Sequence, residues 1–270
     1  MKKELVCPDP IAAELVRKQL RTTFIGHLVN YLPSTPSTNT IAQELAREGA
    51  PEGTVVIADY QTHGRGRLAR RWLSPPGEDL LFSVILRPSL GPAQAFQATL
   101  VSSLAVAHAI KRETGLEALI KWPNDIYIKG KKASGILTEL GFSGGYLTYV
   151  IVGIGINSNS DPSVHPEIQG RATSLRLEVG HHVARLPLLA AVLELLEGFY
   201  VRLKHGEFKT LKAMWDGLSL IKDKKITLSS GEEMHEGIAE SVTDDGMLIT
   251  RDQGGRRRCF IIGDVSLSLK

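Results

Sequence analysis

Hydrophobic positions divide the chain into short apolar runs and amphipathic segments. Two runs bounded by glycine and proline, residues 54–58 and 80–86, predict buried strands. Four further runs follow one another closely after residue 117, with glycine turns between them, and read ALIKW, IYIKGKK, ASGILTEL and YLTYVIVGIGI. This succession is typical of a mostly antiparallel meander, so we expect a mixed, largely antiparallel central sheet.

Segments with helical periodicity surround these runs. The first is a short amphipathic helix over residues 9–21, and the second covers 41–49 with Thr38 or Asn39 as its expected cap. A long buried helix is predicted over 93–114, ended by Gly115, and two more over 187–204 and 207–216. The combination predicts an α+β fold with helices flanking the sheet.

The pattern changes after Leu220. Short β runs, separated by Ser-Gly, Asp-Gly and Gly-Gly turns about ten residues apart, are typical of a small barrel of about fifty residues. We therefore expect an N-terminal helical extension at 1–22, a ligand-binding domain at 23–220 and a C-terminal barrel at 221–270.

Composition fits a globular protein with a real core, because 43% of the residues are hydrophobic and 23% are charged. The net charge of +3 is too small to predict nucleic-acid binding. Cys7 and Cys259 are too few for a disulfide framework, which favours a reducing cytoplasm. The N-terminus lacks the apolar block of a signal peptide, and no window approaches a membrane span of roughly 18 apolar residues.

An arginine-rich loop, QTHGRGRLARRW at residues 61–72, follows the strand predicted at 54–58. Gly64, Gly66 and Ala69 formally match a dinucleotide-binding fingerprint, which requires a helix opening at the loop. The sequence Ser-Pro-Pro-Gly at 74–77 breaks any such helix, so this alternative is weak. Forked guanidinium groups between glycines can hold phosphate or carboxylate oxygens. A solvated surface loop remains the alternative to an anion clamp from residue types alone.

A second candidate is Lys121-Trp-Pro-Asn-Asp125, followed by Lys132 and Gly135. The Pro-Asn-Asp segment also suits a purely structural turn. Lys132 can supply a mobile positive charge to an oxygen that gains charge during adenylyl transfer, or it can be a solvated turn lysine.

Two polar or glycine-rich segments complete the candidates. Ser37-Thr38-Asn39 can cap a helix or read a small polar head group, and one role does not exclude the other. Glycines in Gly153-Ile-Gly155-Ile-Asn157 indicate close approach of backbone or ligand to a strand. P-loop, α/β-hydrolase and paired Cys-x-x-Cys zinc motifs are absent from the sequence, and His181-His182 fit a loop rather than a metal site.

Taken together and in this order, these motifs resemble the biotin–protein ligase family, strongly over residues 24–160. The final segment, with Gly263-Asp-Val-Ser-Leu267, resembles that family's small C-terminal domain. The resemblance implies a class II aminoacyl-tRNA-synthetase-like fold with an SH3-like barrel. It also implies a two-step reaction in which biotin and ATP, with Mg²⁺, form biotinyl-5′-AMP before a lysine of a biotin carboxyl carrier protein takes the biotinyl group.

The resemblance also implies roles for individual residues. It implies catalytic roles for Lys132 and Arg67, and a magnesium ligand at Asp125. The implied biotin-binding residues are Ser37, Thr38, Asn39, Gln61, Gly64, Arg65, Gly66, Arg67, Trp72, Lys132, Gly135 and Gly155. The implied nucleotide-binding residues are Arg65, Arg67, Trp72, Asn124, Asp125, Lys132 and Asn157.

The sequence departs from repressor members of that family, because residues 1–22 are too few for a helix-turn-helix unit. We therefore expect the form without a DNA-binding domain and no DNA partner. A homodimer through a sheet edge near YLTYVIVGIGI is a further expectation. Two other functions stay open: a lipoyl-protein ligase or octanoyl transferase, and a sensor that binds biotin or nucleotide without consuming ATP.

Overall fold

The computed structural model describes residues 9–89, 91–230, 233–261 and 263–267. A seven-stranded sheet forms its centre, with strand order β1-β2-β3-β7-β6-β5-β4. In that order the strands are Val29–Leu32, Val55–Ala58, Leu80–Leu86, Tyr146–Ile156, Lys131–Ser143, Asp125–Ile128 and Leu119–Lys121. β1 is parallel to β2, and the other neighbouring pairs are antiparallel. The mixed, largely antiparallel sheet predicted from the sequence is confirmed.

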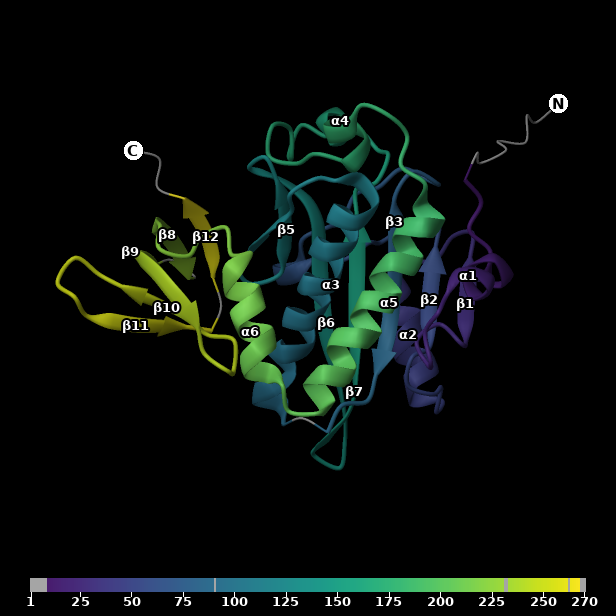
Figure 1. Cartoon of the computed structure of the whole chain (residues 1–270), viewed down its shortest axis with the longest axis horizontal. Helices are drawn as coiled ribbons and strands as arrows, with labels where there is room; N and C mark the ends of the chain where they lie inside the picture. Colours follow the sequence, from purple (N-terminus) through teal and green to yellow (C-terminus); the bar gives the residue numbers. More distant parts are fainter. Residues whose placement is uncertain (1–8, 90, 231–232, 262, 268–270) are drawn as a thin grey trace.

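Helices cover the two faces of this sheet unequally. α3 (Phe96–Thr114) and α5 (Arg185–Lys204) pack side by side against one face, with α6 (Phe208–Gly217) beside them (Figure 1). Their buried aliphatic side chains and those of the strands form the main core. α2 (Thr38–Arg47) packs on the opposite face against β2, β3 and β7, around a smaller core. None of the described helices combines the length and the apolarity needed to cross a bilayer.

Alternation along β7 assigns its side chains to the two faces. Val152 and Ile154 belong to the main core, whereas Ile151 belongs to the smaller core on the α2 side. Because strand residues two apart share a face, Gly153 and Gly155 also lie on the α2 side. On this half of the α2 face β7 presents only glycines, and it is where the candidate site lies.

A second sheet follows the helices and has strand order β11-β10-β9-β8-β12, antiparallel throughout. In that order the strands are Arg257–Phe260, Leu248–Arg251, Glu233–Val242, Lys225–Ser230 and Asp264–Leu267. It lies beyond α6 in Figure 1. The indole N–H of Trp122 donates to the carbonyl oxygen of Gly246 at 2.9 Å, which ties this sheet to the β4–β5 turn. The small C-terminal β structure predicted from the sequence is confirmed.

Two expectations about helices are corrected by the structure. The first helix is α1 (Ala13–Gln19), shorter than the predicted 9–21, because Asp9 instead accepts hydrogen bonds from Arg185. The predicted cap of α2 is wrong: Ser37 is the residue before the helix, and Thr38 and Asn39 lie within its first turn. The side chains of Thr38 and Asn39 bond to strands rather than to helix N–H groups.

Other element boundaries differ less from the prediction. α3 begins at Phe96 after a single 3-10 turn over Pro92–Ala95, rather than at residue 93. The short strand β1 and the five-residue helix α4 (Leu175–Val179) were not predicted. Both are too short to show a clear period in the sequence.

The expected edge strand at YLTYVIVGIGI is also wrong. Over Val150–Ile156, β7 pairs with β3 on one side and β6 on the other, so this part is interior to the sheet. The sheet's edges are β1 and β4. A run of apolar residues predicts burial on both faces, but it does not show the order of strands in the sheet.

Candidate ligand-binding site

Three glycines on the α2 face of the sheet, Gly135, Gly153 and Gly155, form the centre of the site; we call this strip without side chains, against which Trp72 and Asn39 pack, the trough. Gly135 and Gly155 are paired across β6 and β7. The Trp72 ring lies over both: a methyl group built at Gly155 would lie 2.6 Å from Trp72 Cε2, and one at Gly135 would lie 2.9 Å from its Cζ3. Only glycine leaves room for this ring, which explains the glycine pattern seen in the sequence.

The first turn of α2 forms one wall of the trough. Asn39 lies against Gly153, where an added methyl group would approach Asn39 Oδ1 to 2.0 Å. The Asn39 amide donates to Glu139 Oε2 at 2.6 Å and to the Leu137 carbonyl at 3.3 Å, while Ser83 donates to Asn39 Oδ1 at 2.6 Å. Both N–H groups of this amide are therefore held by β6.

Thr38 and Gln61 lie together at the same wall. Gln61 Oε1 accepts from the Thr38 backbone N–H at 2.7 Å and from its hydroxyl at 3.1 Å. The Ser83 hydroxyl is 2.7 Å from Thr38 Oγ1. Ser37, Thr38 and Asn39 are all buried. The structure thus brings the predicted head-group residues into one polar cluster.

The arginine loop, residues 61–72, covers this part of the sheet and closes on itself. The Gly66 N–H donates to the Arg70 carbonyl at 2.7 Å, and the Trp72 N–H donates to the Gly64 carbonyl at 2.9 Å. Leu68 and Ala69 at its tip have φ of 54° and 58°, which residues with a Cβ rarely adopt. Beneath it is a cavity of about 620 Å³, whose lining includes Arg65, Arg67, Leu137 and Glu139. A Rossmann helix does not follow the loop, as the proline break predicted.

Three arginines of the loop contact three different elements. Arg65 Nη2 is 2.9 Å from Glu139 Oε2 on β6, and Arg67 Nη1 is 3.5 Å from Asn124 Oδ1 in the β4–β5 turn. Arg70 forms an ion pair with Asp264 on β12. Burial lowers the pKa of Arg67, while the attraction of Asp125 and Asp264 opposes that shift. A partly desolvated guanidinium of this kind interacts strongly with an anionic ligand.

Lys132 lies at the end of the trough beside Trp72. Its Nζ is 2.6 Å from Asp125 Oδ1 and 5.6 Å from the centre of the Trp72 ring. Lys121 lies nearby, and burial lowers its pKa although Asp125 acts in the opposite direction. Burial also raises the pKa of Tyr127, which contacts Lys121 at 3.2 Å, to about 12. Four cations, Arg67, Arg70, Lys121 and Lys132, therefore lie near two carboxylates, Asp125 and Asp264, and this excess of positive charge suits a polyanionic ligand.

The oxygen ligands available to a cation are few. Among the described residues no group of three or more histidine, cysteine, aspartate or glutamate side chains could hold a metal ion. Asp125 and Asn124 supply oxygens at one place, but Asp125 is paired with Lys132. Mg²⁺ commonly binds through one or two carboxylates together with substrate phosphates. The residues fit a magnesium ion that arrives with a nucleotide rather than a resident metal.

Two candidates from the sequence bond to other parts of the protein, and the nucleotide-binding role of Asn157 stays a prediction. Trp122 is 1% exposed and bonds the second sheet, so it does not line the trough. Asn157 is buried, and its amide donates to the Thr173 carbonyl at 2.9 Å, just beyond the end of β7. His181 and His182 lie in a loop, as predicted.

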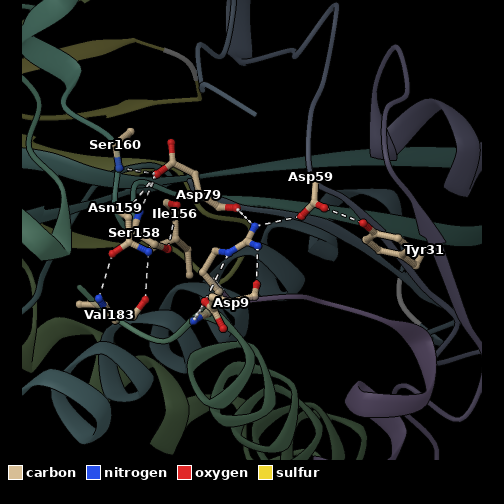
Figure 2. Close-up of polar contacts among 10 residues, drawn as sticks. Asp9, Tyr31, Asp59, Asp79, Ile156, Ser158, Asn159, Ser160 and Val183 are labelled. Carbon is tan, nitrogen blue, oxygen red and sulfur yellow. Dashed lines mark hydrogen bonds and ion pairs between the residues drawn. The ribbon is translucent and has the colours of Figure 1, made fainter. Parts of the chain in front are cut away.

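A buried polar network supports the strand ends below the site (Figure 2). Arg185, with no exposed side-chain surface, donates to Asp59 at 3.0 Å and to the Asp79 carbonyl at 3.2 Å. One Asp79 carboxylate oxygen accepts from the backbone N–H groups of residues 158–160. Because Asp59 follows β2, Asp79 precedes β3 and residue 158 follows β7, this network fixes three strand ends relative to one another.

Sequence reasoning missed the residues that hold the site together. Ser83 and Glu139 contact predicted site residues, and Asp264 pairs with Arg70 of the arginine loop. Glu139 carried one usable signal, since it is a charge within the apolar run ASGILTEL. Ser83 is a common residue type in an ordinary strand position, and nothing in the linear pattern marks it; Asp264 stands in the Gly263-Asp-Val-Ser-Leu267 segment, but its contact with the arginine loop was not predicted.

Known proteins resemble this chain in sequence and in fold. Residues 31–157 match the model of the biotin/lipoate A/B protein ligase family. The bifunctional ligase/repressor BirA of Bacillus subtilis is 35% identical over 94% of this chain and 78% of its own length. The biotin–[acetyl-CoA-carboxylase] ligase of Mycobacterium tuberculosis is 31% identical over 95% of this chain and 97% of its own. A biotin protein ligase from Aquifex aeolicus, solved with biotin and ATP, superposes with a TM-score of 0.75 at 31% identity, covering 90% of this chain and all of that one.

The central sheet and its helices are therefore those of the class II aminoacyl-tRNA-synthetase-like fold, with a small C-terminal β structure attached. More particularly, the chain belongs to the biotin–protein ligases of the biotin/lipoate A/B protein ligase family.

Proposed function

We propose that the chain is an ATP-dependent ligase that activates biotin as biotinyl-5′-AMP and transfers the biotinyl group to a lysine of a biotin carboxyl carrier protein. One observation carries the proposal. The glycine trough packed by Trp72 lies directly beside Lys132, and the cavity bounded by the arginine loop adjoins it, so an apolar, neutral end and a strongly cationic end meet. Biotinyl-5′-AMP has the same division between a neutral head and an acyl phosphate.

The head-group end consists of the polar cluster at the first turn of α2. Thr38, Gln61 and Ser83 are already bonded to one another in this structure, which fixes their donors and acceptors before a ligand arrives. Such preorganisation reduces the entropy lost on binding. We assign biotin recognition to this cluster and to the trough below Trp72. Asn39 shapes the wall, since both its N–H groups are held by the protein.

The cationic end brings together two reactants that repel each other. In the first step a biotin carboxylate oxygen attacks the α-phosphorus of ATP, and pyrophosphate leaves with the bonding electron pair. In the second step the unprotonated amine of the acceptor lysine attacks the acyl carbon, and AMP leaves. We assign Arg67 and Lys132 to stabilising the charge that develops on the phosphate oxygens. No residue of the chain needs to form a covalent bond to the substrate.

Nucleotide binding is assigned to the cationic end as well. We assign Asn124 and Asp125 to a magnesium ion bound to the phosphates, which requires Arg67 and Lys132 to turn from these oxygens toward the phosphates. Arg65 and Arg67, held above the cavity, would restrict the access of water to the mixed anhydride. The cytoplasmic location and the absence of a DNA partner stay predictions.

Biotin-dependent exchange of labelled pyrophosphate into ATP tests the first step. Exchange that requires biotin supports the proposal, whereas exchange only with lipoate supports a lipoyl ligase. Tight binding of biotin without exchange supports a sensor. Transfer of labelled biotin to a purified carrier domain, compared with the same domain lacking its acceptor lysine, tests the second step.

The Arg67→Ala variant tests the role assigned to the arginine loop. Loss of this partly buried cation should accelerate release of biotinyl-5′-AMP and cause labelling of unrelated proteins added to the reaction. Arg112→Ala is the control, because Arg112 pairs with Glu194 between α3 and α5, on the opposite face of the sheet. Retention of the intermediate with unchanged target selectivity in Arg67→Ala would contradict the assignment.

A further inference from the structure

We propose that Glu139 is a positioning residue of this site: its carboxylate holds Arg65 of the arginine loop at the rim of the trough and sets the orientation of the Asn39 amide. The inference rests on the function proposed above, because the quantity it changes is retention of the acyl-adenylate.

The position of Glu139 is unusual for a charged side chain. It lies on β6 directly opposite Ile151, which has no exposed surface, and its own side chain is 22% exposed. Alternation along β6 places it on the same face as Leu137 and Gly135, that is, on the α2 face. A carboxylate among apolar neighbours is unfavourable unless polar partners compensate for its lost hydration. Its partners therefore identify what it does.

The first partner is Asn39. A carboxylate can only accept hydrogen bonds, so Glu139 Oε2 at 2.6 Å requires the NH₂ side of the Asn39 amide to face it. The amide oxygen then faces Ser83, which donates to it at 2.6 Å. Since Ser83 also contacts Thr38, Glu139 is connected through Asn39 to the cluster assigned to the biotin head group.

The second partner is Arg65. Its Nη2 is 2.9 Å from the same Oε2 atom, and the Arg65 side chain is 42% exposed. A guanidinium has five N–H donors, of which this contact uses one, so Arg65 can hold Glu139 and a ligand oxygen at the same time. The pair also neutralises Glu139, so that its negative charge does not repel the phosphate.

Removing Glu139 should release Arg65 from the rim. A partly exposed ion pair contributes modestly, so we expect Glu139→Ala to accelerate dissociation of the acyl-adenylate by about 5-fold. Glu139→Gln keeps an oxygen acceptor for Asn39 or Arg65 but lacks the charge, and it should have a smaller effect, about 2-fold. If Glu139 served folding alone, the variants would differ in melting temperature but not in the rate at which the acyl-adenylate dissociates.

A double-mutant cycle tests whether Glu139 acts through Arg65. Labelled biotin, ATP and Mg²⁺ form the intermediate on the full chain, and an excess of unlabelled biotin then reveals its dissociation rate. The variants are Glu139→Ala, Glu139→Gln, Arg65→Ala and the double variant Glu139→Ala/Arg65→Ala. Glu194→Ala is the matched control, because Glu194 also pairs with an arginine, at 3.2 Å, and is 24% exposed. Thermal melting of each variant shows whether it folds.

The proposal requires the Glu139→Ala effect to be clearly smaller when Arg65 is already alanine, with only the part that passes through Asn39 remaining. An equal acceleration by Glu139→Ala with Arg65 present and with Arg65→Ala would overturn the proposal. Unchanged dissociation in Glu139→Ala would also overturn it. Slower dissociation would overturn it as well, because Glu139 would then compete with the ligand for Arg65. Should wild-type protein form no labelled intermediate, the proposed function itself fails. That outcome is distinct from normal intermediate formation with no effect of Glu139.

Discussion

A single methyl group at Gly155 should disturb the site more than the fold. In Gly155→Ala the new Cβ would lie 2.6 Å from Trp72 Cε2, 2.7 Å from Cζ2 and 2.9 Å from Nε1. Ordinary contacts are 3.4–4 Å, so the ring or the strand must shift by about 1 Å. β7 is hydrogen-bonded on both sides at this point, whereas Trp72 belongs to a loop. The ring should therefore move.

Inserting a methyl group into a packed contact typically costs about 1–3 kcal/mol. If the displaced Trp72 ring enters the space that biotin would take, the cost appears in ligand binding. The dissociation constant for biotin then rises by about 5- to 150-fold. If the protein instead accommodates the strain, the penalty appears as a lower melting temperature, by about 2–4 °C for each kcal/mol. Isothermal titration with biotin and differential scanning calorimetry on the same variant separate these two results.

Gly198→Ala provides the control. Gly198 lies on the exposed side of α5 with no atom within 4 Å of an added methyl group. Replacing a helical glycine by alanine should stabilise the protein by about 0.5–1 kcal/mol and leave biotin binding unchanged. A Gly155→Ala variant with the wild-type biotin affinity and melting temperature would refute the inferred contact between Trp72 and the trough floor.

The buried network below the site allows two further predictions. Arg185→Met leaves the carboxylates that this side chain bonds without their buried cation, and should reduce the free energy of unfolding by about 3–5 kcal/mol in urea denaturation; a change below about 0.5 kcal/mol would contradict the network. Asp79→Asn should show a pH-dependent effect, because burial raises the pKa of Asp79 despite its hydrogen bonds to Ser158 and Ser160. A carboxyl group with a raised pKa in the folded state favours folding below its unfolded pKa of about 3.9, and this contribution is lost as the pH rises through the folded value. The melting temperature of Asp79→Asn relative to the wild type should therefore increase from about pH 4 to pH 8 in calorimetry, and a difference that falls or stays constant would show that the pKa is not raised.

Several features of the site could be predicted because they are local in the chain. The glycine pairs, the arginine loop and the position of Lys132 lie in short segments whose residue types have few alternative uses. Periodicity also located the long helices α3 and α5 to within a few residues, since their apolar positions recur over several turns. Residue type and spacing within a short segment are sufficient to predict these features.

Because these motifs are local, they did not predict which partner each individual side chain contacts. Trp122 and Asn157 stand in motifs typical of a site, yet they bond to Gly246 and Thr173. Thr38 and Asn39 stand where a helix cap is expected, yet their side chains face β3 and β6. Local pattern predicts which groups are available, but the partner of each group depends on what the fold places beside it.

The sequence by itself determined the order of most elements, the mixed sheet and the segments that carry cations and small polar groups. Only the tertiary structure decided that β7 is interior, that Glu139 meets both Asn39 and Arg65, and that Arg185 joins Asp59 to Asp79. Each of these contacts joins residues far apart in the chain, from 74 positions for Arg65 and Glu139 to 126 for Arg185 and Asp59. Periodicity over a few residues reports which face of an element is buried, whereas long-range pairing depends on how all the buried faces pack together.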